Sequence, residues 1–182
     1  MTRAALTRSV LPIFALFGIA YLVVMVVLGA QPVQRQLVKF EASGVLRIAP
    51  QSAERVRLSR AGRQVMFIRA KDGIWTWEDG ASLGEAAPTH IETGLKMLHN
   101  SGPVRKIEPD ELIGIDTRPF LLEDPAVIVD VTGGGQFLTA RFGSLNPEGF
   151  LQYMRLDGDQ RIYLMSRFIG AELVSAFEAA QR

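Results

Sequence analysis

The sequence predicts an α+β domain that follows a single membrane-spanning helix. Three observations support this fold class: residues 10–30 carry no charged side chain, short runs of alternating apolar residues are typical of strands, and two later segments repeat apolar residues at helical spacing. Four strands and one helix are expected within about residues 44–102, and the same order within about residues 126–182. The sequence therefore predicts antiparallel β-meanders with helices, arranged as a pseudo-repeat of ββββα.

The apolar run at residues 10–30 is long enough to cross a bilayer. At about 1.5 Å of rise per residue, a helix of this length extends roughly 31 Å, against a hydrocarbon layer of about 30 Å. The residues expected to form this membrane anchor are Val10, Leu11, Ile13, Phe14, Phe17, Ile19, Leu22, Val23, Val26 and Leu28. Ala15, Gly18 and Ala20 are small, so a neighbouring helix can approach closely there.

A cleaved secretory signal is the alternative interpretation, because Arg3 and Arg8 precede the run and Gly29 and Ala30 close it. The uncleaved anchor is favoured for two reasons. The apolar run exceeds the roughly 7 to 15 residues that are usual for a signal, and Leu28 is large where a cleavage site needs a small residue. The chain has no cysteine, which excludes a lipid-modified cysteine and disulfides.

Residues 1–9 are expected to form a cytoplasmic tail and residues 31–43 a linker beyond the bacterial inner membrane. Two arginines in the tail are matched by Arg35 and Lys39 in the linker, so the positive-inside rule favours neither orientation strongly. A short tail without acids resembles a signal anchor, and long domains translocate largely regardless of charge. Residues 44–182 are therefore predicted to lie in the periplasm. Contacts with lipid headgroups are expected from Arg35, Lys39 and Arg47.

The charge balance argues against a nucleic-acid partner. Four of the 20 basic residues flank the apolar run, which leaves 16 basic against 19 acidic residues for the domain. Seven basic residues nevertheless cluster early in the domain: Arg47, Arg55, Arg57, Arg60, Arg63, Arg69 and Lys71. They either meet anionic headgroups or line the solvent face of a sheet. The sheet face is favoured, because Arg55 and Arg57 alternate with Val56 and Leu58.

The first half of the domain is expected to form strands around residues 46–48, 56–58, 65–68 and 74–77. Pro88 and Thr89 then open a helix, in which Ile91, Leu95 and Leu98 recur at helical spacing and which ends at residues 100–102. Trp75 and Trp77 are two apart on a strand, so they share a face, which is either a packed edge of the core or an exposed contact surface. The packed edge is favoured, because buried tryptophan is the more common case.

A linking passage at residues 103–125 precedes the second half of the domain. Strands are then expected around residues 127–131, 137–142, 150–154 and 162–164, and a closing helix around residues 169–177. Gly133, Gly134 and Gly135 are expected to form a hairpin turn, since the Gly-Lys-Ser/Thr of a phosphate-binding loop does not follow them.

No set of residues predicts catalysis, a cofactor site or a metal site. His90 and His99 are the only histidines, and on a helix their spacing points them in different directions. The adjacent acids at residues 110–111 and 123–124 are expected to be solvated loop carboxylates, because neighbours in sequence seldom converge on one substrate atom. The protein is therefore predicted not to be an enzyme. Acid–base chemistry would have to use scattered carboxylates, such as Asp110 or Asp130.

Several short motifs of the domain follow a pattern of Gly-Leu-Asp, proline and an extended strand. They are residues 112–116 (Leu-Ile-Gly-Ile-Asp), Pro119 and the strand at 126–131, with Ile115 where the pattern usually has leucine. Other residues that agree with the same pattern are Trp75, Phe142-Gly143, Gly149 to Arg155 and Ile162-Tyr163-Leu164. In these motifs the chain resembles an uncharacterised bacterial family of membrane-anchored envelope proteins. Some members of that family are associated with gliding-motility-type ABC transport genes, and its pattern includes no catalytic residues.

These observations predict a single-pass accessory or assembly subunit of the inner membrane. Its expected partners are the lipid bilayer and other subunits of a larger respiratory, photosynthetic or transport complex. The alternative, which the resemblance implies, is a ligand-binding auxiliary protein of an ABC-type envelope transport system.

Overall fold

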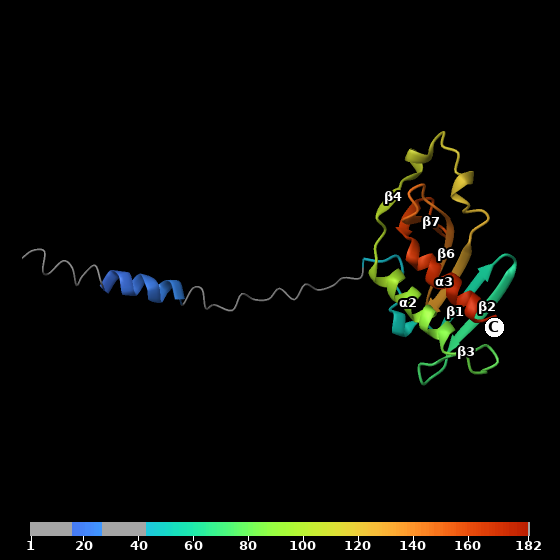
Figure 1. Ribbon diagram of the computed structural model, residues 1–182, viewed down its shortest axis with the longest axis horizontal. Helices are drawn as coiled ribbons and strands as arrows, with labels where there is room; N and C mark the ends of the chain where they lie inside the picture. The colour runs from blue at the N-terminus through green and yellow to red at the C-terminus, as the bar shows by residue number, and fades with distance from the viewer. Residues whose placement is uncertain (1–15, 27–42, 182) are drawn as a thin grey trace, which may run out of the picture. The chain divides into compact units, whose positions relative to one another are not determined.

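The computed structural model describes residues 16–26 and 43–181 (Figure 1). The chain divides into two units, residues 1–40 and residues 41–182. In the first unit, residues 16–26 form an α-helix whose side chains are all exposed. Among the described residues, no helix is both long enough and apolar enough to cross a membrane. The predicted anchor extends past this helix into residues 10–15 and 27–30, which lie outside the described residues.

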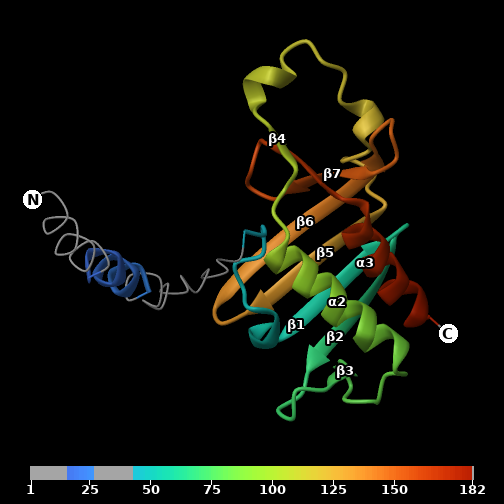
Figure 2. The same cartoon turned by 60° about the vertical axis from the view of Figure 1, so that its left-hand side comes forward.

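The second unit is built on an eight-stranded antiparallel sheet with the strand order β3-β2-β1-β5-β6-β7-β8-β4 (Figure 2). The strands are β1 (Arg55–Arg60), β2 (Arg63–Arg69), β3 (Trp75–Trp77), β4 (Arg105–Ile107), β5 (Val127–Gly133), β6 (Gln136–Leu145), β7 (Leu151–Leu156) and β8 (Ile162–Ser166). Two meanders, β1 to β3 and β5 to β8, meet where β1 pairs with β5 and Leu58 lies opposite Val129. The predicted α+β class is confirmed for the described residues.

Two helices, α2 (Ala86–Asn100) and α3 (Arg167–Ala179), lie side by side across one face of the sheet (Figures 1 and 2). They pack closely, because an added Cβ on Gly94 of α2 would lie 3.1 Å from the Leu173 Cδ2 of α3. The helices and the sheet enclose the core, since alternate strand residues point toward them. The strand residues buried in this core are Val56, Leu58, Phe67, Trp75, Val127, Val129, Val131, Ala140, Phe142, Met154, Tyr163 and Met165.

Two local predictions are wrong. Residues 46–48 are not a strand; the Leu46 N–H donates to the Leu98 carbonyl at 3.1 Å, so this segment packs against the end of α2 instead of joining the sheet. The first half therefore supplies three strands before its helix, where four were expected. The passage at residues 103–125 is more than a link, because it contains β4, η2 (Pro109–Leu112) and η3 (Arg118–Phe120). Residues 46–48 resemble a strand in sequence because alternating apolar residues indicate burial of one side. A loop that packs against the end of a helix is buried in the same way as a strand.

Two other local predictions are confirmed. Gly134 and Gly135 have φ values of 58° and 72° and form the turn between β5 and β6, which is the backbone conformation that favours glycine in hairpins. Trp75 is only 2% exposed. Trp77 stacks on Phe67, with 5.7 Å between the ring centroids. The two tryptophans therefore form a packed edge of the core.

Candidate functional site

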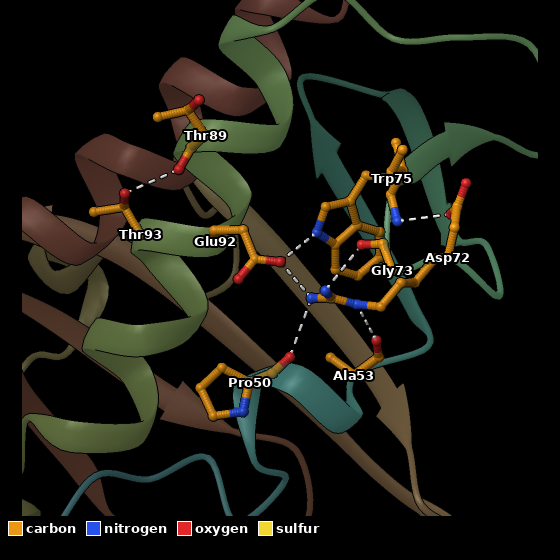
Figure 3. Close-up of polar contacts among 10 residues, drawn as sticks. Pro50, Ala53, Asp72, Gly73, Trp75, Thr89, Glu92 and Thr93 are labelled. Carbon is orange, nitrogen blue, oxygen red and sulfur yellow. Dashed lines mark hydrogen bonds and ion pairs between the residues drawn. The ribbon is translucent and has the colours of Figure 1, made fainter.

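A largely buried guanidinium connects four segments of the domain (Figure 3). Arg69, at the end of β2, lies over the ring of Trp75, with 4.3 Å between Cζ and the ring centroid. Its Nε donates to the Ala53 carbonyl at 2.9 Å, its Nη1 to that of Gly73 at 3.2 Å and its Nη2 to that of Pro50 at 3.1 Å. The guanidinium thus holds η1 (Pro50–Ser52) and the β2–β3 turn in place.

Glu92 completes this group from α2. Its Oε1 accepts a hydrogen bond from Arg69 Nη2 and a second one, at 2.8 Å, from Trp75 Nε1 (Figure 3). The side chains of Arg69 and Glu92 are only 15% and 29% exposed. We call Arg69, Trp75 and Glu92 the Arg69 cluster. The donors of Arg69 and Trp75 are bound to acceptors of the domain itself. We therefore infer that the Arg69 cluster is structural and holds α2 on the sheet.

Both histidines also make structural contacts. His90 Nδ1 lies 2.7 Å from Glu172 Oε2 and so connects α2 to α3. His99 Nδ1 lies 2.9 Å from the Leu46 carbonyl oxygen. Within residues 16–26 and 43–181, no three His, Cys, Asp or Glu residues are grouped to hold a metal ion.

Neighbouring donors lower the pKa of two of the candidate carboxylates, Glu111 and Glu123. The backbone N–H of Glu108, and then the Arg105 side chain, lower the pKa of Glu111. The Arg155 guanidinium likewise lowers the pKa of Glu123. Asp130 accepts hydrogen bonds from Arg57 Nε at 2.7 Å and from Thr139 Oγ1 at 2.5 Å. A general acid at neutral pH needs a raised pKa, so the shifts at Glu111 and Glu123 favour ion pairing over proton donation.

The segment at residues 108–126, which we call the connecting segment, folds over part of the sheet face that the helices leave free. Phe120 stacks on Tyr153 of β7 with 4.1 Å between ring centroids, and Leu122 is only 4% exposed. Ser144 Oγ donates to the Pro119 carbonyl at 2.7 Å. Gly143 permits this approach, because an added Cβ would lie 1.9 Å from the Phe120 carbonyl oxygen. The connecting segment is therefore anchored to β6 and β7 at its second half.

A cavity of about 290 Å³ lies between the connecting segment and the sheet. Its lining residues are Leu112, Thr117, Arg118, Leu121, Leu122, Glu123, Asp124, Arg155, Gln160 and Ile162. Leu121 has a φ of 51°, a left-handed conformation that is rare for a leucine and is often associated with functional sites. The cavity combines apolar walls with charged groups, a composition suited to a small molecule with an apolar part and a polar part.

The predicted basic cluster separates into two groups. Arg55 and Arg57 lie on the sheet face opposite the helices, where they line a hollow of about 170 Å³ with Asp130 and Phe137. Arg60 instead bonds Glu178 of α3 at 2.5 Å, and Arg69 belongs to the Arg69 cluster. Arg63 also turns toward α3, with 5.9 Å between its Cζ and the ring centroid of Phe177. The prediction of a solvent-facing sheet surface is therefore confirmed for Arg55 and Arg57, whereas Arg60, Arg63 and Arg69 reach toward the helices.

The predicted anchor and headgroup residues are described in part. Those in the helix at residues 16–26 are Phe17, Gly18, Ile19, Ala20, Leu22, Val23 and Val26. Those outside the described residues are Val10, Leu11, Ile13, Phe14, Ala15, Leu28, Arg35 and Lys39. Arg47 is exposed on the segment that precedes η1. The sequence did not predict the Arg69 cluster or the cavity. The one signal for the cavity was the proline-containing segment of about 20 residues, because long connections inside a small domain are often functional.

Comparisons with protein-family models, with curated proteins and with solved structures found no match for this chain.

Proposed function

We propose that the protein is a single-pass accessory or assembly subunit of the bacterial inner membrane, anchored by residues 10–30, whose periplasmic domain braces a larger complex. The main support is the helix at residues 16–26. Its large apolar side chains are exposed around the whole circumference, as in Leu16 (72%), Phe17 (70%) and Val26 (66%). A helix that is apolar all round requires lipid or protein around it.

The domain has the properties of a rigid brace. Side-chain contacts connect each helix to the sheet or to the other helix. They are the ion pairs of the Arg69 cluster and of Arg60 with Glu178, and the hydrogen bond between His90 and Glu172. Side chains that are used in this way add stiffness and leave the outer surfaces to make contacts. Two meander-and-helix units that meet at β1 and β5 also support the predicted pseudo-repeat, with three strands in its first copy and four in its second.

Membrane retention after alkaline carbonate extraction tests the anchor. We expect the full chain to stay with the membrane pellet. A Leu22→Arg/Val23→Arg variant should be released, because each arginine at the centre of a span costs about 2.5–3.5 kcal/mol, whereas Leu22→Ala/Val23→Ala should be retained. Recovery of soluble protein that begins near Gln31 would contradict the proposal.

Sizing after extraction in a mild detergent tests the role as a subunit. We expect the protein to migrate with other chains in an assembly larger than its own 20.0 kDa. A protein that migrates only as a free monomer from native membranes would contradict the role, even if the anchor is retained.

The cavity beside the connecting segment supports a second candidate function, that of a ligand-binding auxiliary protein for envelope transport. A thermal-shift series with phospholipids and envelope glycans tests it on the full chain in detergent. A ligand should raise the melting temperature of the wild type and of Gln136→Trp, which alters the distant β5–β6 hairpin. The same ligand should fail with Gln160→Trp, which places an indole at the cavity wall. A flat response across both ligand classes would contradict this function.

A further inference from the structure

Four large apolar side chains are exposed at one end of the sheet. They are Val104 (69% exposed), Leu145 (46%), Phe150 (73%) and Phe168 (58%). We call these four residues the end patch. Exposed aromatic and aliphatic side chains that gather at one place typically mark a surface that contacts another partner.

Strand register places the four residues together. Leu145 lies opposite Gln152 at the β6–β7 end, and Leu151 lies opposite Ser166 at the β7–β8 end. The Val104 N–H donates to the Leu164 carbonyl at 2.9 Å, next to the start of β4. The end patch therefore follows the ends of four adjacent strands, β6, β7, β8 and β4, and spans about 14 Å, because neighbouring strands lie about 4.8 Å apart.

The chain enters the domain close to Val104, at the β4 side of the end patch. Ser43 Oγ donates to the Asn100 carbonyl at 3.0 Å, and the Gly44 N–H donates to that of His99 at 2.9 Å. An added Cβ on Gly102 would lie 3.0 Å from the Ser43 carbonyl oxygen, and Gly102 precedes Val104 by two residues. Figure 2 shows the cyan segment that precedes β1 beside the end of α2, from which the chain passes into β4.

The charges around the end patch are mainly basic. Arg47, Lys106 and Arg167 are exposed on the segments that carry or flank it. Arg167 Cζ lies 5.3 Å from the ring centroid of Phe168. The acid in the neighbouring β6–β7 turn is Glu148, which accepts a hydrogen bond from Asn146. Apolar side chains with a basic border are the features by which proteins rest on anionic membranes.

We propose that the end patch rests on the anionic surface of the bilayer and so sets the orientation of the domain. This inference rests on the proposed anchor. Residues 31–42 separate the predicted span from Ser43, and 12 residues extend at most about 40 Å. A tether of this length holds the end patch near the surface at an effective concentration of about millimolar, so a weak contact is enough to keep it there.

Single-cysteine labelling of the full chain in vesicles tests the proposal, and the absence of native cysteine makes each label unique. Leu145→Cys, Phe150→Cys and Phe168→Cys, each carrying an environment-sensitive fluorophore, are compared in vesicles that contain phosphatidylglycerol. Gln136→Cys is the matched control, because it is exposed at the opposite end of β6, about 30 Å away from Leu145. Leu145→Cys is also examined with Phe150→Ser and Phe168→Ser together.

Labels in the end patch should emit at shorter wavelength than the control label and should be quenched by lipids brominated near the headgroup. The two serine substitutions should return the label at position 145 to the emission of the control, with circular dichroism unchanged. Water-like emission at all positions, in protein that resists alkaline extraction, would overturn the end-patch proposal and leave the anchor intact. Release by alkali would overturn the anchor itself. A shift seen in native membranes but not in lipid vesicles would also overturn the proposal, since it would indicate a protein partner.

Discussion

Removal of the Glu92 carboxylate is the most direct test of how the helices are held on the sheet. Glu92→Ala deletes the acceptor that Trp75 Nε1 reaches at 2.8 Å and the charge that faces Arg69. Arg69 keeps its three carbonyl acceptors, so it remains in place without a counter-charge. The variant therefore leaves a shielded cation and a buried indole N–H with incomplete partners.

The expected cost follows from the burial of these groups. Trp75 is 2% exposed, and a buried donor without an acceptor costs about 1–3 kcal/mol. The loss of one partner from a shielded ion pair adds to this. Part of that loss is recovered because the Glu92 side chain is 29% exposed, so water can reach Arg69 at the site that the carboxylate leaves. Together we expect the free energy of unfolding to fall by about 2–4 kcal/mol, or about 6–12 °C in melting temperature for a domain of this size.

Urea denaturation of the full chain in detergent, followed by tryptophan fluorescence, measures this change. Glu178→Ala is the matched control, because Glu178 also joins a helix to an arginine of the sheet, but its side chain is 53% exposed. That variant should lose at most about 1 kcal/mol, as exposed ion pairs do. Glu92→Gln, which retains an acceptor for the indole, should fall between the two. An equal loss for Glu92→Ala and Glu178→Ala would refute the role assigned to the Arg69 cluster.

Three further predictions concern the connecting segment, a turn and a tyrosine. Gly143→Ala places a Cβ 1.9 Å from the Phe120 carbonyl oxygen, so it should cost about 1–3 kcal/mol in urea denaturation, while Gly84→Ala, with nothing within 4 Å, should cost nothing. Ala61 has a φ of 48° in the β1–β2 turn; Ala61→Asn should stabilise the domain by about 0.5–1 kcal/mol, and a loss would contradict the turn geometry. Burial, and then the hydrogen bond to Asp159, raise the pKa of Tyr163 from 10.0 to about 12. The folded state retains this proton to higher pH than the unfolded state, so the associated stability is complete below pH 10 and is lost as the pH rises toward 12. The free energy of unfolding, measured across this range, should therefore fall less steeply with pH in Tyr163→Phe than in the wild type. An equal slope in both proteins would contradict the assignment.

The local patterns of the sequence were sufficient for most elements of the domain. Alternation placed β1, β2 and the four strands from β5 to β8, and helical spacing placed α2 and α3, because burial of one face imposes these periods on any sequence. The hairpin at Gly133 to Gly135 was also readable, since its backbone conformation selects glycine. Residues 46–48 differ: their alternation indicates burial, but only their packing against α2 decides that they form no strand.

The sequence by itself determined the α+β class, the two meanders with their helices and the apolar run that predicts a membrane anchor, because each depends on residues close together in the chain. The tertiary structure alone decided the pairing of β1 with β5, the Arg69 cluster, the cavity under the connecting segment and the end patch. These features join residues from distant parts of the chain, such as Arg69 with Glu92 and Val104 with Leu164. No local period records such a contact, since it forms only when sheet register and helix packing bring the segments together.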